Sequence, residues 1–431
     1  MSQDAQKKGL PYWLLLAYFF FEFVRPQTQF LPFLSPLRIP GILEILLPVV
    51  WFVSLPKEAL RERPVRYAIG FLLTMAVTVI FAINGHWVFQ RSKAVAIMMF
   101  AGMLPAAALL VRSDRMAHFL RFWVVTQTLV ALACLLNGGV GTGSFLFDEN
   151  DLALALCMAI PYPFFLRRSP LVGKATQWFY LGATGAMILG VAATRSRGGF
   201  LGLVALLGVM WLWSKNRVKN AILILAVATA GSGILVASAP EGYFDEMATI
   251  SDTQDSTRLE RLKSWGLGWD MFVDNPILGV GAGNYPWTVH TYQLRRSMFS
   301  SGEKMLGGRE AHSLYFTLLP ELGLVGTLLF IGVLLSLNRR LKRLMRRVET
   351  SSRESDQAEE FRLAALAMRC SMVTFLINAV FISVLYYPHL WYLVGFTVAL
   401  ERALEHVYSE RNVTLSKPEL VLDSELPPVP A

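Results

Sequence analysis

Long apolar runs dominate this sequence and decide which solvent most of it folds in. Eight of them are long, and four more are shorter or interrupted. The long runs cover 67–83, 94–111, 118–136, 176–194, 198–213, 220–238, 313–336 and 368–384, and the others cover 12–24, 41–55, 151–166 and 389–401. A helix needs about 20 predominantly apolar residues to cross a bilayer. The sequence therefore predicts an all-α integral membrane protein with about twelve transmembrane helices.

Composition excludes a soluble alternative of this length. Charged residues make up 16% of the 431-residue chain and apolar residues 54%, whereas ordinary soluble domains have roughly 25% charged residues. The three cysteines, Cys134, Cys157 and Cys370, all lie inside apolar runs. Neither a disulfide framework nor a thiolate metal cluster is therefore expected.

The basic residues indicate the orientation of the spans. Positive charge is enriched in the cytoplasmic segments of membrane proteins. With a cytoplasmic N-terminus, the segments 57–66, 112–115, 167–174 and 214–220 and the basic run from Arg339 all fall inside. Both termini are then cytoplasmic. The net charge of +9 is read as this orientation signal, and no nucleic-acid partner is expected.

One long polar stretch, 239–312, interrupts the apolar pattern between spans nine and ten. The predicted organisation is an N-terminal membrane region of about nine spans (1–238), an extracytoplasmic domain (239–312), a C-terminal membrane region of about three spans (313–401) and a cytoplasmic tail (402–431). Long loops between spans are usually functional when they contain their own structure.

The external stretch carries two recognisable features. An amphipathic helix, predicted from Thr257 to the Asn275-Pro276 pair, has an apolar stripe that could lie on the bilayer surface. The stripe consists of Leu259, Leu262, Gly266, Trp269 and Val273. The run GVGAGNY (279–285) follows as a tight loop with exposed backbone, and it contains Gly281, Gly283 and Asn284.

Several sequence signatures are missing. The chain has no GxxxxGK[ST] loop, no HExxH, no paired-cysteine spacing and no DxD pair, so neither ATP hydrolysis nor a metal site is indicated. An enzyme with this sequence would draw its energy from a pre-activated substrate. No metal and no cofactor are expected.

Two pairs of arginines are candidate anion ligands on the extracytoplasmic side. Arg195 and Arg197 lie beside glycines at the turn between spans seven and eight, where forked donors and free backbone N–H groups can hold a phosphate. Arg258 and Arg261 are three residues apart and project from one face of the amphipathic helix. The alternatives are interface arginines that snorkel and an ordinary solvated helix face.

His312 lies where the external segment enters span ten, so its neutral imidazole could accept a proton near neutral pH. The alternative is a polar histidine at the membrane interface. Glu321 lies within the span, where an acid is costly and more often functional or paired than idle. Helix capping explains Asp148, Glu149 and Asp151 at the start of span six.

These residues together resemble a known family. His312 with Gly323 and Gly326, TRSRGGF (194–200), STRLERLKSW (256–265) and DNPILGVGAGN (274–284) are similar to the signatures of the O-antigen ligase and O-antigen polymerase superfamily. The resemblance implies a twelve-span enzyme of the bacterial inner membrane with a periplasmic domain before the histidine-bearing span. It implies a catalytic role for His312 and pyrophosphate binding by Arg195, Arg197 and Arg261. Arg258 matches less directly, since the motif centres on the arginine of R-L-x-x-W. Glu321, Gly281, Gly283 and Asn284 are expected to support this site.

The leading hypothesis is an O-antigen ligase, an inverting glycosyltransferase that needs no metal or nucleotide. It would move O-antigen from undecaprenyl pyrophosphate to lipid A–core on the periplasmic side, with the two substrates and membrane lipids as its partners. An O-antigen polymerase and a protein O-oligosaccharyltransferase are the alternatives within the superfamily. A lipid-glycan transporter is the alternative outside it, although the sequence shows no clear two-fold repeat and its arginines cluster at one face of the membrane.

Overall fold

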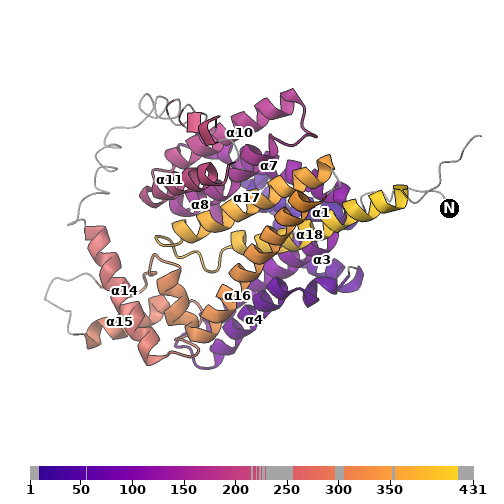
Figure 1. Ribbon diagram of the computed structural model, residues 1–431. Coiled ribbons are helices and arrows are strands. Elements are labelled where there is room, and N and C mark those ends of the chain that lie inside the picture. Colours follow the sequence, from indigo (N-terminus) through magenta and orange to yellow (C-terminus); the bar gives the residue numbers. More distant parts are fainter. Residues whose placement is uncertain are drawn as a thin grey trace, which may run out of the picture.

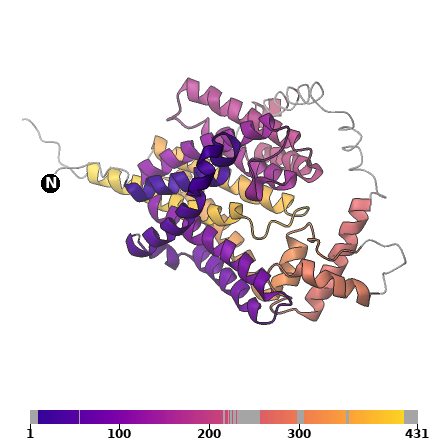
Figure 2. The ribbon, with the colours of Figure 1, turned by 180° about the vertical axis from the view of Figure 1, so that it is seen from behind.

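The computed structural model describes residues 9–54, 56–214, 256–296, 305–351 and 355–415, together with short pieces between 217 and 229. Every regular element in these ranges is a helix. Figure 1 shows a bundle of packed helices with α14 and α15 at one corner, and Figure 2 shows the same arrangement from behind. The predicted all-α architecture is confirmed for this part of the chain.

The first half of the bundle begins with α1 (Leu10–Phe23) and α3 (Ile39–Ser54), joined by the short α2 (Pro26–Gln29). It continues with α4 (Arg63–Val77), α5 (Gly85–Ile97), α6 (Leu104–Leu109) and α7 (Ser113–Leu136). A π-helical turn at Met98–Met103 joins α5 to α6. Pro105 has no N–H to donate to the carbonyl of residue 101 and its ring clashes there, so the wider turn relieves this conflict.

The remaining helices complete the described part of the chain. They are α8 (Glu149–Ala159), α9 (Pro161–Leu166), α10 (Lys174–Ala193), α11 (Arg197–Leu212), α14 (Ser256–Asp274), α15 (Tyr285–Arg295), α16 (Tyr315–Thr350), α17 (Asp356–Asn378) and α18 (Pro388–Leu415). Pro161 separates α8 from α9, because proline cannot donate the hydrogen bond that would continue the ladder.

Membrane-length apolar helices make this an integral membrane protein. Five stretches in the described ranges are long and apolar enough to cross a bilayer. They are Pro32–Ser54, Arg63–Ile80, Gly85–Leu109, Ser113–Leu136 and Tyr315–Thr350. The count of twelve spans stays a prediction, and most of the predicted span 220–238 lies outside the described residues.

The predicted span 368–384 is misplaced. The helix there, α17, begins at Asp356 and ends at Asn378, and residues 379–387 contain no helix. Polar residues in its first half hid this helix from a hydropathy reading, but two of them are paired. Arg362 contacts Glu359 with both its Nε and Nη2 donors at 2.6 Å, and Glu360 lies 3.7 Å from Arg121.

Two helices also run further than the apolar pattern suggested. α16 continues to Thr350 and carries the basic run that begins at Arg339. α18 continues to Leu415, beyond the start of the predicted tail at residue 402. An ion-pair network holds these extensions together, since Arg340 contacts Glu62 and Glu401 at 2.5 Å each and Arg402 contacts Glu62 at 2.9 Å.

The segment around α14 and α15 has an apolar core separate from that of the bundle. It contains Leu267, Met271, Val280, Tyr285, Val289, Tyr292, Leu306 and Ala311. Such a core is what a domain needs to hold its own shape. The extracytoplasmic domain at 239–312 stays a prediction, and its stretches 239–255 and 297–304 lie outside the described residues.

Loops predicted on the same side of the membrane contact one another. At the end of the bundle that carries His312, the Thr28 hydroxyl donates to the Thr142 carbonyl (3.2 Å) and the Ser196 hydroxyl to Asn150 Oδ1 (2.7 Å). We call this the His312 end. The opposite end carries the Arg340 network, and we call it the Arg340 end. This grouping supports the predicted topology, which remains a prediction.

Candidate functional site

The site is built around a kink near the start of α16. Gly323 has φ 57° and ψ −156°, outside the helical region, and Pro320 lies three residues earlier. The loop after α14, residues 276–281, forms hydrogen bonds with the backbone groups that the kink leaves without helical partners. Val280 N and Gly281 N donate to the carbonyls of residues 320 and 321 (2.8 and 3.0 Å), and the amides of residues 324 and 325 donate to the carbonyls of residues 276 and 277 (2.8 and 3.1 Å). The backbone groups left without helical partners at the kink therefore form hydrogen bonds with another part of the chain.

Two glycines permit this close approach of backbone to backbone. Gly279 has φ 69°, and a Cβ there would lie 2.3 Å from the carbonyl carbon of Glu321. A Cβ on Gly323 would lie 2.5 Å from the carbonyl carbon of Ile277. Any larger residue would meet main chain, which cannot move aside as a flexible side chain can.

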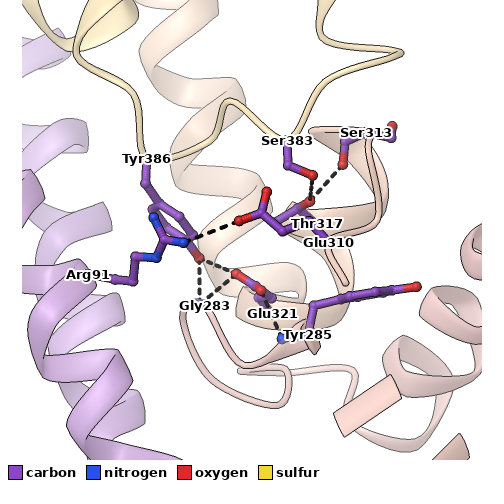
Figure 3. Close-up of polar contacts among 9 residues, drawn as sticks. All are labelled: Arg91, Gly283, Tyr285, Glu310, Ser313, Thr317, Glu321, Ser383 and Tyr386. Atoms are coloured by element: carbon purple, nitrogen blue, oxygen red, sulfur yellow. Dashed lines mark hydrogen bonds and ion pairs between the residues drawn. The ribbon is translucent and has the colours of Figure 1, made fainter. Parts of the chain in front are cut away.

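Glu321 locks the loop against the kink. Its side chain is 1% exposed, and its carboxylate accepts hydrogen bonds from Gly283 N (2.7 Å), Tyr285 N (2.9 Å) and the Tyr386 hydroxyl (2.5 Å), as Figure 3 shows. A carboxylate in such a place is stabilised by directed donors, as buried charge requires. The arrangement suits a positioning residue, because its oxygens are already occupied.

The loop also anchors the corner between α4 and α5. Asn284 is fully buried; its Oδ1 accepts from Asn84 N (2.8 Å) and its Nδ2 donates to the Asn84 carbonyl (3.3 Å). The amide of Ala282 donates to the Thr78 hydroxyl at 3.1 Å. The predicted supporting residues Gly281, Gly283, Asn284 and Glu321 thus meet in one structural unit.

A polar pocket opens beside this unit. It encloses about 340 Å³ of empty space, part of it open to solvent. Arg91, from α5, crosses it to form an ion pair with Glu310 at 3.2 Å, and its guanidinium group also lies 6.0 Å from the Tyr386 ring centre. Glu321 and Tyr387 contribute to the walls.

The sequence analysis missed Arg91, Tyr386 and Tyr387. Arg91 was one more basic residue between two predicted spans, and the tyrosines lie in the short gap between the predicted spans 368–384 and 389–401. The available signal was the pair of tyrosines directly before Pro388, at the predicted boundary of a span. Tyrosine is common where one end of a side chain is apolar and the other wet.

His312 directly follows Ala311, which lines this pocket. Its backbone is left-handed, with φ 49°, and its side chain is exposed. Surrounding protein atoms and the positive charge of Arg261 lower the pKa of His312 below its usual 6.5, against an opposing effect of Glu310 and Asp148. The neutral imidazole, which can accept a proton, is therefore favoured at neutral pH.

Helix α14 holds the His312 turn in place. Trp265 Nε1 donates to the Ala311 carbonyl at 2.9 Å, and the Trp265 ring stacks on Phe316 at 5.0 Å with an interplanar angle of 5°. Arg261 lies one turn earlier on the same helix, and Arg258 is exposed a further turn back. The spacing R-L-x-x-W thus places Arg261 and the tryptophan that orients the histidine turn on one face.

The predicted apolar stripe of α14 points away from the protein. Leu259, Leu262, Trp269 and Val273 are between 42% and 57% exposed. Helices that lie on a membrane surface show this pattern of one apolar face without a protein partner. The helix ends at Asp274, directly before Asn275-Pro276, as predicted.

Arg195 and Arg197 flank the start of α11. Arg195 has left-handed backbone, with φ 56°, and is exposed, whereas Arg197 is the first helical residue and is half-buried. Ser196 caps the helix by accepting from Gly199 N at 2.9 Å, and its hydroxyl donates to Asn150 of α8. This corner reaches the His312 region through α8, since Asp148 at the start of that helix acts electrostatically on His312.

The acidic residues at the start of α8 have two different roles. Asp148 is the N-cap and accepts from Asn150 N at 2.8 Å, so capping explains it as predicted. Asp151 is only 5% exposed and hydrogen-bonds with the Tyr387 side chain, so capping does not account for it. Within the described ranges, no three His, Cys, Asp or Glu side chains are grouped so as to hold a metal ion.

Fold and site together define a class: a multispan helical membrane protein with a basic, histidine-bearing site at one end of the bundle. Residues 182–331 match the family model described as O-antigen ligase, so the chain contains an O-antigen ligase family domain. Members of this family are glycan-transferring enzymes that act on lipid-linked glycans. The match includes all the predicted site residues, whereas Arg91, Asp151 and Tyr386 lie outside it. A comparison with curated proteins finds no match.

Proposed function

We propose that this protein is an O-antigen ligase that transfers glycan from undecaprenyl pyrophosphate to a hydroxyl of lipid A–core. The observation that carries the proposal is that Arg261 acts electrostatically on His312, which directly follows the pocket residue Ala311, within the segment that matches the family. A proton acceptor next to an anion ligand is what the reaction needs. The His312 end would then face the periplasm.

In the proposed reaction, His312 removes the proton from the acceptor hydroxyl as its oxygen attacks the anomeric carbon. The new glycosidic C–O bond forms while the bond from the anomeric carbon to the pyrophosphate oxygen breaks, with inversion at that carbon. The electron pair leaves with undecaprenyl pyrophosphate. Neutral His312 is suited to this step, because its lowered pKa keeps it unprotonated at neutral pH.

The arginines would bind the leaving group. Arg261 lies on α14 close to His312, and Arg195 and Arg197 lie at the start of α11 in the same end of the bundle. Arginine presents forked donors that match phosphate oxygens, and such donors are most useful where negative charge grows in the transition state. Arg258, one turn from Arg261, would extend the same basic surface towards the lipid chain.

The apolar stripe of α14 supports the location of the reaction. A helix with Leu259, Leu262, Trp269 and Val273 exposed would rest on the bilayer surface and hold Arg261 at headgroup level. The pyrophosphate of a polyprenyl carrier lies at that level. A soluble substrate would require no such stripe.

The decisive experiment is reconstitution of the purified full chain with lipid-linked O-antigen in detergent, without any ion gradient. Separate reactions would offer lipid A–core, a second lipid-linked glycan or an acceptor peptide. Transfer to lipid A–core alone supports the ligase. Transfer only to a second lipid-linked chain would identify a polymerase, transfer only to the peptide a protein-glycosylating enzyme, and no transfer to any acceptor would refute the proposal.

His312→Gln tests the proposed base in the same assay. Glutamine retains hydrogen-bonding capacity but cannot take a proton at neutral pH, so activity should fall by about 10²–10⁴-fold. His290, an exposed histidine on α15, provides the matched control as His290→Gln. Equal activity of the two variants would exclude His312 as the base.

A further inference from the structure

A second polar pocket lies at the Arg340 end of the bundle, between the chain after α9, the end of α11 and the facing parts of α16 and α17. It encloses about 940 Å³, including the part open to solvent. Four basic side chains and two acidic ones line it: Arg167, Arg168, Lys219, Arg362, Glu349 and Glu359. The proposed glycan-transfer reaction uses none of them.

Positive charge is concentrated in this pocket. Burial and, after it, the positive charges of Arg167 and Arg362 together lower the pKa of Arg168 to about 10. Arg362 is held rigidly, because Glu359 contacts it at 2.6 Å and Glu349 at 3.5 Å. The charges of Arg167 and Arg362 disfavour the charged form of Arg168, and a bound anion would offset that effect.

The rest of the lining is apolar. Met345, Leu363, Leu366 and Trp213 complete the pocket. The guanidinium group of Arg369 lies 4.3 Å from the Trp213 ring centre and holds that ring in place. Trp211 and Leu212, which precede Trp213, are 40% and 51% exposed. Basic and apolar groups therefore adjoin at the end of a membrane helix, where a phospholipid headgroup meets its acyl chains.

We propose that this pocket binds the phosphate of an anionic phospholipid, with Arg167, Arg168 and Lys219 as its ligands and Arg362 as a fixed positive charge behind them. A basic pocket between membrane helices is a recognised form of headgroup site. The mixed lining favours a lipid over a free phosphate ion, since free phosphate has no use for the apolar wall. The inference is independent of the glycan-transfer proposal.

Native mass spectrometry of the full chain in detergent tests this inference. Phosphatidylglycerol, zwitterionic phosphatidylethanolamine and inorganic phosphate would each be titrated separately. The wild type should bind phosphatidylglycerol at least tenfold more tightly than phosphatidylethanolamine. Inorganic phosphate at an equal concentration should not displace the lipid.

Arg168→Gln should weaken phosphatidylglycerol binding by about 10- to 100-fold, the range expected for loss of one charge-assisted hydrogen bond. Arg167→Gln provides an independent second variant. The matched control is Arg346→Gln, which removes the same charge from an exposed position on α16 and should leave binding unchanged. Each variant is used only if its thermal unfolding without added lipid matches the wild type.

Three results would overturn the inference. Equal affinity for the two lipids would remove the need for an anionic headgroup. Displacement by inorganic phosphate would identify a soluble anion as the occupant. Equal weakening of phosphatidylglycerol binding in Arg168→Gln and Arg346→Gln would show that the lipid responds to general surface charge and not to this pocket.

Discussion

Glu321→Gln should loosen the loop that follows α14 and slow glycan transfer without altering the pH dependence of that transfer. The carboxylate accepts two hydrogen bonds through Oε2, from Gly283 N and the Tyr386 hydroxyl, and one through Oε1, from Tyr285 N. Glutamine replaces one of these oxygens by an NH₂ group. Whichever way the amide is oriented, one backbone N–H then faces a donor: either Tyr285 N loses its acceptor, or Gly283 N keeps only its longer bond to the Tyr386 hydroxyl (3.2 Å).

The size of the effect follows from these contacts. A buried donor left without an acceptor costs about 1–3 kcal/mol, and loss of charge assistance at the remaining bonds costs about 1 kcal/mol more. A total of about 2–4 kcal/mol lowers the ratio of closed to open loop by about 30- to 700-fold. Tyr386→Phe removes only one of the three donors and should cost about 1.5–3 kcal/mol.

Hydrogen exchange measures the loop directly. Peptides containing Gly283 and Tyr285 should exchange faster in Glu321→Gln by a factor within this range, and peptides from α7 should exchange as in the wild type. The double variant with Tyr386→Phe should show less than the sum of the two single effects, because the two residues share a bond.

The same variant separates positioning from catalysis. Rate against pH should keep the wild-type rising limb, because the proposed base is elsewhere. A flat pH profile combined with unchanged hydrogen exchange would show that Glu321 is itself the proton acceptor and would refute the reasoning.

Further outcomes follow from the site and the fold. Activity should rise with pH along a limb below pH 6.5, because the neutral form of His312 is the reactive one and its pKa is lowered; a limb centred above 6.5 would contradict this. Arg261→Ala should lower activity by about 10²–10³-fold, and Arg261→Lys should not restore it, because an ammonium group cannot reproduce the forked donors of arginine. Near-normal activity of the lysine variant would show that Arg261 acts only through its positive charge. A cysteine at Leu294 should react with an impermeant thiol reagent from the periplasm, and one at Lys342 only after the inner membrane is opened, over a low background from the three buried native cysteines; the reverse pattern would invert the topology. Gly323→Ala should lower the melting temperature and disorder the adjoining loop, since its Cβ would lie 2.5 Å from backbone; an unchanged melting temperature and unchanged loop exchange would contradict the interlock.

Much of the fold could be predicted because the information is local. Apolar runs such as 118–136 predicted α7 (Ser113–Leu136) closely, since an uninterrupted apolar segment in a bilayer must satisfy its own backbone as a helix. The end of α14 before Asn275-Pro276 was likewise predictable, because proline cannot continue the hydrogen-bond ladder. The predicted start of α17 was wrong because a hydropathy scale treats Arg362 as unfavourable inside a membrane helix. In the structure Glu359 and Glu349 form ion pairs with it.

The sequence by itself therefore determined that the protein lies in a membrane, that it is helical, where its long polar segment lies in the chain, and which residue types could bind an anion and accept a proton. Only the tertiary structure decided what Glu321 does, since its partner Tyr386 lies 65 residues away. It also decided the anchoring of Asn284 by Asn84, 200 residues apart, and the crossing of the pocket by Arg91. Hydropathy is a property of neighbouring residues and can be read along the chain. The donor that a buried carboxylate finds depends on which distant segments pack together, and no local pattern records it.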